Sequence, residues 1–577
     1  MSYSTLLKTL DKMRREAPRT FKTYHPRSND LNGLNQARAK AFIHLFLKVR
    51  FGLADFAARH ELFCDGSQDG GLDAYFIDQD TRTITLLQSK FRTTENNFEE
   101  KSIDVTELLH MEVGRISKGE KTDSNGKPFS ARIIAFQKKI SEIRDIALYK
   151  WRVVILANVH HINDEQMRRL VDNMDYEVFD FARTYRELVF PLTTGTYFSP
   201  AEIIIKINLG KKAHPQLNQD VETSLGPCNI RILYIPTIEL AHVMAKYRNA
   251  LLRYNPRNFL SLSGNEVNAS IKDTVINTTK NEFALRNNGI TILAEYSSVT
   301  DRTGVSGEGQ LIIKDPQILN GGQTATTLAT MVEDPQTGVA TFEAKEVLLK
   351  IIERPKGKTE LELADFIESI SDATNKQSRI LEADRRSNDP RMTRLQSHFY
   401  DEFGLFMERK RGEFYYGIAD KIVSKKEIVD RVDLARALTA YTGEPARARS
   451  SENRIFEEEG FDKLLTDLNV EQASSAYFAL ESVSEQSATI AATAIRYGKY
   501  AVVYAVSMLD HAGVESGKPV RERSDLLVQR VLGKWQAFEQ HIAALPTNAG
   551  YSTGTAFNYD GYYKGTTVAT DIKGYSW

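Results

Sequence analysis

Hydrophobic and polar positions alternate in two short segments near the N-terminus. Residues 70–77 begin with two glycines and contain Asp73, and residues 84–91 contain Gln88 and Lys90. This pattern, with a short turn between the segments, predicts a β-hairpin with Asp73 at the start of its first strand. Successive side chains of a strand point to opposite faces, so Gln88 and Lys90 share a face, and antiparallel pairing can bring Asp73 beside them.

The segments around this hairpin also have regular periodicity. A helical pattern precedes it at about residues 34–51, and helical patterns follow at 103–116 and 130–149. The apolar run 151–157 predicts a buried strand. The order helix, hairpin, helix and strand predicts an α/β domain at the N-terminus.

Asp73, Gln88 and Lys90 together suggest metal-assisted hydrolysis of a phosphodiester. A carboxylate and an amide oxygen are ligands for a hard cation, which assigns Asp73 and Gln88 to Mg²⁺ or Mn²⁺. A lysine beside them orients or deprotonates a water and offsets developing charge. All three residues are therefore candidate catalytic residues of a metal-dependent endonuclease.

The spacing of these residues resembles the PD-(D/E)xK nuclease superfamily, and Gly-Gly-Leu-Asp…Leu-Gln-Ser-Lys resembles its Mrr-type branch. The resemblance implies a restriction-endonuclease-like fold and nucleic acid, most plausibly DNA, as substrate. Many relatives add a glutamate from the first helix, where this chain has Asn35 and Gln36. Two outcomes are open: either the metal binds more weakly than in those relatives, or another acid such as Asp69, Asp65 or Glu61 completes the site.

Short polar strings are concentrated in the middle of the chain. Strands are predicted at 202–207 and 230–235, a loop at 209–219 and a helix at 237–252. Beyond them, amides and glycines flanked by β-branched residues predict strand ends that share a polar cleft, and the glycine pair before a helix at 324–331 suggests a phosphate or nucleotide ligand. The candidate cleft residues are Asn255, Arg257, Asn287, Asn288, Gly289, Asn320, Gly321, Gly322, Gln323, Thr324, Asn375 and Gln377.

The order of these strings resembles the AIPR family, named for abortive infection phage resistance. The carrying motifs are Asn255/Arg257, Asn287-Asn288-Gly289, Asn320 to Thr324, and Thr374 to Gln377. The resemblance implies a role in bacterial defence against phage. A basic string that also looks like that family, Arg409-Lys410-Arg411, is interleaved with aromatic residues and is a weaker candidate for nucleic-acid contact.

Length and composition set the wider organisation. A chain of 577 residues exceeds one compact core, so several domains are expected. We predict an α/β multidomain protein: a nuclease-like domain at 1–165, a connecting segment at 166–229, an α+β AIPR core at 230–460 and a helical C-terminal region at 461–577. That region carries helices at 488–508 and 521–544, and its Gly- and Tyr-rich tail is either an ordered strand pair or lid, or flexible.

Charge and cysteine content indicate which partners and which cellular compartment the protein can have. The net charge of −1 argues against coating nucleic acid through bulk positive charge, although it permits a local basic groove. Two cysteines exclude a disulfide scaffold and fit a reducing cytosol, and no apolar run is long enough for a membrane span. We therefore expect a cytoplasmic protein with no membrane partner.

These observations favour an antiphage DNA endonuclease gated by the AIPR core. Because an uncontrolled nuclease would kill its host, we expect inhibition at rest, through the central cleft or through self-assembly into a homo-oligomer. A nucleotide or a phage-derived molecule is the expected trigger. Two alternatives remain open. One is a non-catalytic nucleic-acid or nucleotide sensor, and the other is a nucleotide hydrolase that uses the central Asn/Gly/Gln cleft.

Overall fold

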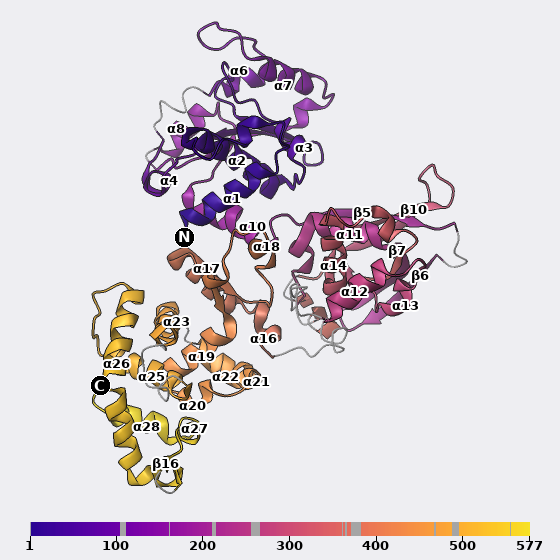
Figure 1. The fold of residues 1–577 in the computed structure, drawn as a ribbon. Coiled ribbons are helices and arrows are strands. Elements are labelled where there is room, and N and C mark those ends of the chain that lie inside the picture. The colour runs from indigo at the N-terminus through magenta and orange to yellow at the C-terminus, as the bar shows by residue number, and fades with distance from the viewer. Residues whose placement is uncertain are drawn as a thin grey trace.

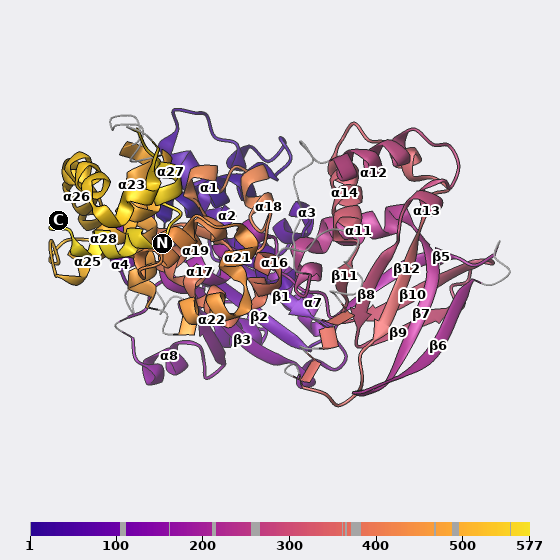
Figure 2. The same cartoon turned by 90° about the horizontal axis from the view of Figure 1, so that it is seen from below.

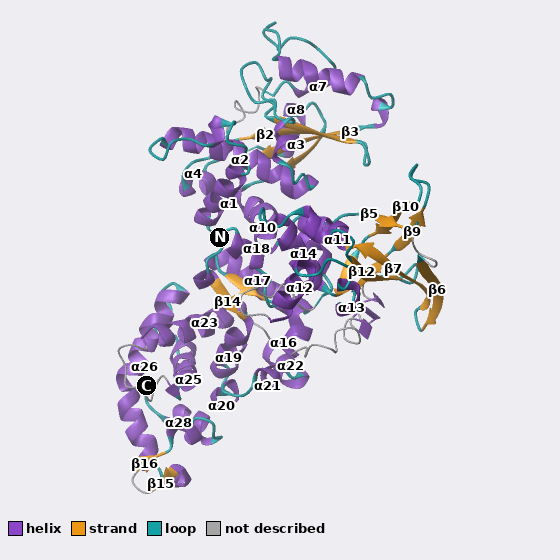
Figure 3. Cartoon of the chain, turned by 45° about the vertical axis from the view of Figure 1, so that its right-hand side comes forward, coloured by secondary structure: helices purple, strands orange, loops and turns teal. Residues whose placement is uncertain are grey.

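The computed structural model shows three lobes that follow one another along the chain (Figure 1). The residues that the structure describes are 2–103, 111–160, 162–210, 215–255, 266–359, 362–363, 366–367, 369–370, 382–466, 469–486, 496–553 and 556–577. Strands gather in the first two lobes, and the third is almost entirely helical (Figure 3).

The N-terminal lobe is a four-stranded sheet with helices on both faces. Its strands are β1 (Ala74–Asp78), β2 (Thr83–Ser89), β3 (Lys150–Leu156) and β4 (Asp175–Val178), in the order β1-β2-β3-β4. β1 and β2 form the predicted antiparallel hairpin, whereas β3 runs parallel to β2 and β4 parallel to β3. Parallel neighbours require a crossover, and α7 (Ala131–Ser141) lies in the one between β2 and β3.

Alternation along the strands divides this lobe into two apolar layers. Ala74 and Leu87 face a core that includes α1 (Tyr3–Arg15) and α2 (Leu31–Phe51). Tyr75 and Leu86 face the opposite core, formed with α7. The predicted helix before the hairpin is therefore confirmed, and it begins at Leu31 because Asp30 caps it by accepting a hydrogen bond from the Gly33 N–H at 2.8 Å.

The middle lobe contains two sheets that share one core. A three-stranded sheet has the order β5-β10-β9 and a five-stranded sheet the order β11-β8-β12-β7-β6. Figure 2 shows these strands side by side, with helices along one edge. The strands are β5 (Glu202–Asn208), β6 (Gln216–Thr223), β7 (Gly226–Pro236), β8 (Ile290–Ala294), β9 (Tyr296–Thr300), β10 (Glu308–Lys314), β11 (Gln317–Asn320) and β12 (Glu346–Glu353). The accompanying helices are α11 (Thr237–Tyr247), α12 (Glu266–Ile276), α13 (Phe283–Arg286) and α14 (Gly322–Glu333).

The C-terminal lobe is a helical assembly around one large apolar core. Its principal elements are α17 (Pro390–Phe403), β13 (Phe406–Glu408), α18 (Tyr415–Ala419), β14 (Ile428–Asp430), α19 (Arg431–Tyr441), α23 (Val470–Glu485), α25 (Lys499–His511) and α26 (Val520–Ala544). The Tyr-rich tail is ordered: α27 (Tyr559–Tyr562) and α28 (Thr567–Gly574) pack on this core with Trp577. The aromatic side chains of the tail therefore serve packing.

Observed elements cross the predicted domain boundaries. β4 belongs to the N-terminal sheet although it lies beyond residue 165, and β5 and β6 belong to the middle sheets, so 166–229 is not a separate connecting segment. β6 occupies part of the predicted loop 209–219 because it pairs with β7. Residues 382–460 pack mainly with the helical lobe, which divides the predicted core 230–460.

Among the described helices, none combines the length and apolar character that crossing a bilayer requires. Cys64 and Cys228 are both buried free thiols.

Candidate metal centre and active site

Asp73 lies one residue before β1, beside the end of β2. The antiparallel ladder of the hairpin ends at Ala74, which pairs with Leu87. The Asp73 N–H donates to the Leu87 carbonyl at 2.9 Å, and the Ser89 N–H donates to Asp73 Oδ2 at 2.6 Å. These two hydrogen bonds tie Asp73 to the residues on either side of Gln88.

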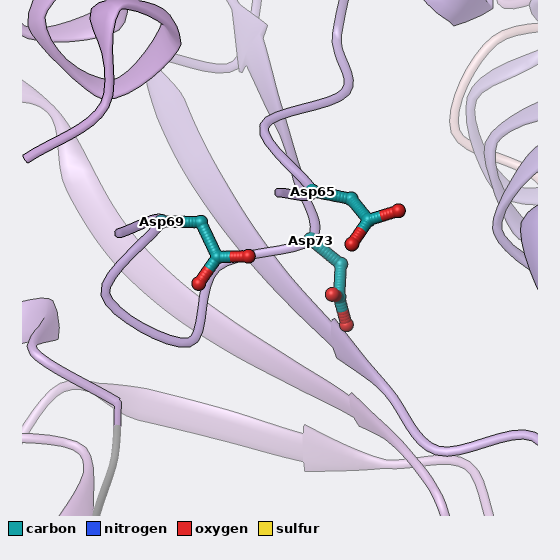
Figure 4. A group of neighbouring side chains, drawn as sticks. All are labelled: Asp65, Asp69 and Asp73. Atoms are coloured by element: carbon teal, nitrogen blue, oxygen red, sulfur yellow. The ribbon is translucent and has the colours of Figure 1, made fainter. Parts of the chain in front are cut away.

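A tight loop before β1 brings two further carboxylates beside Asp73. Ligand oxygens of Asp65, Asp69 and Asp73 all lie within 4.8 Å of one another (Figure 4). Asp69 is held by the Gly66 and Gly71 N–H groups at 3.0 and 2.9 Å. Three carboxylates at this spacing are a ligand set suited to Mg²⁺ or Mn²⁺, since both cations prefer oxygen donors.

The glycines of this loop are required by its backbone. Gly70 and Gly71 have φ of +62° and +72°, a region that residues with a Cβ rarely adopt. A Cβ at Gly70 would also lie 2.9 Å from side-chain atoms of Ile116 and Phe129. The Gly-Gly-Leu-Asp string therefore fixes the loop that assembles the three acids.

The environment of Asp73 favours its protonated form when no cation is present. The pKa of Asp73 is raised to about 7, chiefly by burial and in addition by the charges of Asp65 and Asp69. The Ser89 N–H and the Lys90 charge act in the opposite direction. A divalent cation would compensate the crowded negative charge and favour the ionised cluster.

Gln88 and Lys90 occupy the end of β2. Gln88 is buried, and its Oε1 has no hydrogen-bond partner among the described residues. A buried acceptor without a donor is costly, so this oxygen is suited to a ligand or water. The Lys90 N–H donates to the Leu156 carbonyl at 3.1 Å, and its side chain lines a small cavity with Arg92 and Lys101.

Of the three acids named from sequence as possible completions of the site, the structure brings Asp65 and Asp69 to Asp73. Glu61 is not part of that group. The feature of the sequence that indicates Asp65 and Asp69 is their position in the glycine-rich segment just before Asp73. The catalytic roles of Asp73, Gln88 and Lys90 stay predictions.

The central polar strings meet at one end of the five-stranded sheet. Asn287 donates from Nδ2 to Thr324 Oγ1 at 3.1 Å and accepts the Gly289 N–H at 2.9 Å. Asn255 donates from Nδ2 to the Leu319 carbonyl at 3.2 Å, and Asn320 Oδ1 accepts the Gly321 N–H at 2.6 Å. The described parts of three of these strings therefore lie together, and these amides bond to a threonine hydroxyl and to the backbone.

Close packing at Gly321 reinforces this reading. Its φ is +85°, and a Cβ there would lie 2.5 Å from Ile290 Cδ1 and 2.8 Å from the Gly289 carbonyl oxygen. A Cβ at Gly322 would meet Leu252 at 3.1 Å and Asn255 Nδ2 at 3.3 Å. The glycine pair thus permits contact between protein segments at these points. Predicted cleft residues that lie outside the described part are Arg257, Asn375 and Gln377.

The basic string 409–411 is largely engaged within the protein. Lys410 is 5% exposed, and its ammonium donates to the Arg253 and Asn255 carbonyls at 2.7 and 3.0 Å. Arg409 pairs with Glu413 at 2.8 Å. Lys410 is therefore not available to a nucleic acid at the surface, because its donors join the middle lobe to the C-terminal lobe. Burial also lowers its pKa to about 7.

The fold and site define a multidomain protein with an acidic cluster in an N-terminal α/β lobe and an extensive helical C-terminal region. Residues 252–537 match the family model described as AIPR protein. The match supports an AIPR protein over that region and leaves the N-terminal lobe outside. It starts later than the predicted core at 230 and extends into the C-terminal helices. Searches of curated proteins and of solved structures found no match.

Proposed function

We propose that the chain is a metal-dependent endonuclease of antiphage defence, acting on DNA from its N-terminal lobe. The observation that carries the proposal is the convergence of Asp65, Asp69 and Asp73 at the end of a hairpin that also holds Gln88 and Lys90. The elements α2, β1, β2, α7 and β3 follow one another in the order helix, hairpin, helix and strand that the sequence pattern predicts. The AIPR match supports the defence role.

The carboxylate oxygens of Asp65, Asp69 and Asp73 fit a divalent cation, and we propose the unpartnered amide oxygen of Gln88 as a further ligand. A bound cation supplies Lewis-acid stabilisation of the charge that develops on the phosphate. Asp73 contributes an ionised carboxylate, which the Ser89 N–H orients. Lys90 positions the attacking water and contributes positive charge beside the cluster.

Gating is proposed to act through the contacts between the lobes. The segment Gly404–Val423 packs into the N-terminal core through Phe406, Phe414, Ile422 and Val423. The same segment holds the backbone at Asn255 through Lys410. Movement of the middle or C-terminal lobe would therefore act directly on the core that supports α2.

The test is cleavage of plasmid and phage DNA by the full chain with Mg²⁺ or Mn²⁺. Asp73→Ala and Lys90→Ala should abolish metal-dependent cutting, whereas the matched charge removals Asp78→Ala and Lys138→Ala should retain it. Cutting that persists in the first pair would contradict this active site. Without cutting by any protein, phage protection in cells decides, because protection by Asp73→Ala would remove the nuclease from the mechanism.

A non-catalytic sensor is the second candidate, favoured by Asn35 and Gln36 on α2, where many relatives of the nuclease superfamily have a glutamate, and by the burial that raises the pKa of Asp73 to about 7. DNA binding measured with Lys90→Ala separates the two, since an enzyme loses turnover while a sensor keeps binding and phage protection. The nucleotide hydrolase alternative requires a reactive centre at the Asn/Gly/Gln strings, where Asn255 and Asn287 are bonded internally.

A further inference from the structure

The middle lobe contains an open pocket of about 630 Å³ that none of the predicted motifs occupies. It lies where β6 and β7 of one sheet face β9 of the other, beside the end of β12. Its volume falls in the range of about 300–1,000 Å³ that small-molecule sites occupy. Six of its lining residues are charged, aromatic or hydroxyl-bearing side chains that could contact a ligand or support one that does: Arg231, Tyr296, Ser297, Glu353, Arg354 and Lys356.

The pocket is at the opposite end of the sheet from the Asn/Gly/Gln strings. Those strings reach β12 near Leu348, whose carbonyl oxygen is 2.7 Å from a Cβ built at Gly289. The pocket is reached at Glu353, five residues further along the same strand, a distance of roughly 16 Å at about 3.3 Å per residue. The two features are therefore separate sites.

Ser297 holds two charged side chains in place at the floor of the pocket. Arg231 is 9% exposed and donates from Nε to Ser297 Oγ at 3.0 Å and from Nη2 to the Ser297 carbonyl at 3.3 Å. Glu353 Oε1 accepts both the Ser297 N–H and its hydroxyl, at 2.9 and 2.7 Å. One residue thus orients a guanidinium and a carboxylate on neighbouring strands, so the floor offers donors and an acceptor at set positions.

The rim adds positive charge and an aromatic surface. Arg354 is anchored by Asp315 at 2.9 Å, and Lys356 is exposed. The ring of Tyr296 is 46% exposed on β9. Asp220 also lines the pocket and accepts from Asn229 Nδ2 at 2.9 Å. Arg354 is partly neutralised by Asp315, whereas Arg231 and Lys356 form no ion pair with a carboxylate among the described residues. Their charges favour an anion, and a half-exposed ring favours a ligand with a flat aromatic group.

We infer that this pocket binds a nucleotide. Arg354 and Lys356 contact its phosphates, Tyr296 stacks on its base, and the free oxygen of Glu353 accepts from a hydroxyl or an exocyclic amine. Arg231 holds the floor in place and adds positive potential beneath the phosphates. The inference concerns the middle lobe alone, and its failure would leave the nuclease proposal unchanged.

Calorimetric titration of the full chain with ATP, AMP and inorganic phosphate tests the assignment. We expect one nucleotide per chain, weakened at least fivefold by Lys356→Ala, Arg354→Ala or Tyr296→Ala. The matched control Lys280→Ala, an exposed lysine outside the pocket, should bind as the unmodified chain does.

Three results would overturn the inference. The first is no nucleotide binding at millimolar concentration by a chain whose thermal unfolding is normal. The second is binding that the pocket variants leave unchanged. The third is inorganic phosphate binding as tightly as ATP, together with an unaffected Tyr296→Ala variant, because the pocket would then recognise an anion and no base.

Discussion

The Ser89 N–H donates to the Asp73 carboxylate at 2.6 Å and ties this acid to the end of β2. This hydrogen bond fixes the direction of a carboxylate whose other neighbours, Asp65 and Asp69, repel it. The hairpin therefore orients Asp73, and the glycine-rich loop before β1 brings the other two acids of the cluster beside it.

Magnesium affinity should depend on pH through Asp73. Its pKa of about 7 means that a proton must leave before the carboxylate binds a cation. Below about pH 7 the apparent Kd for Mg²⁺ should therefore rise by up to roughly tenfold per pH unit, and above it the Kd should level off. Calorimetry between pH 6 and 8 measures this.

Asp73→Asn should bind Mg²⁺ weakly, with little dependence on pH over this range. Glu61→Gln, at an acid outside the cluster, should keep the affinity and the pH profile of the unmodified chain. A pH-independent Kd in the unmodified protein would contradict the protonated state of Asp73.

Gly321→Ala should destabilise the middle lobe strongly. The substitution forces a residue with a Cβ to a φ of +85° and places that Cβ 2.5 Å from Ile290 Cδ1. We expect a loss of roughly 2–4 kcal/mol in unfolding free energy. Gly338→Ala, where a Cβ meets nothing within 4 Å, should stay within about 1 kcal/mol. Denaturant unfolding compares the two, and equal effects would refute the packing argument.

Lys410→Met should loosen the contact between the middle and C-terminal lobes. It leaves the Arg253 and Asn255 carbonyls without their ammonium donor, at a cost of roughly 2–5 kcal/mol. Limited proteolysis should cut the chain faster near residue 255. Lys425→Met, at an exposed position, should leave the cleavage rate unchanged. A loss of DNA binding with normal proteolysis would instead support surface contact by this string.

His44 should make the N-terminal lobe sensitive to acid. The ring is fully buried, bonds to Arg59 Nε at 3.2 Å and to the Tyr24 hydroxyl at 3.0 Å, and burial lowers its pKa to about 2. In the unfolded chain the His44 ring binds a proton near pH 6.5, whereas the buried ring of the folded chain stays neutral at that pH. The free energy of unfolding therefore keeps its full value above that pH. It should fall by about 1.4 kcal/mol per pH unit from about pH 6.5 towards pH 2.

Thermal unfolding between pH 7.5 and 5 tests this dependence. His44→Gln should show a shallower decline than the unmodified chain, because it removes the titrating group. The exposed His511→Gln should retain the full decline. Parallel profiles for the His44 variant and the unmodified chain would contradict the prediction.

The sequence by itself determined the hairpin, the position of Asp73 at the start of its first strand, α2, α7 and the long helix α26. These follow from local periodicity and capping, which a short stretch of chain already contains. It also pointed to Asp65 and Asp69, because a glycine-rich loop keeps neighbouring residues close.

Tertiary structure alone decided what the other polar residues do. The composition of the Asn255, Asn287 and Gly321 strings suggests a ligand cleft, yet Asn255, Asn287 and Asn320 bond to protein groups, since unpaired buried amides are costly. Lys410 stands in a basic string that is typical of a protein surface, but its side chain is buried and donates hydrogen bonds inside the protein. The pocket around Arg231 joins strands distant in sequence, and long-range pairing of this kind leaves no local pattern.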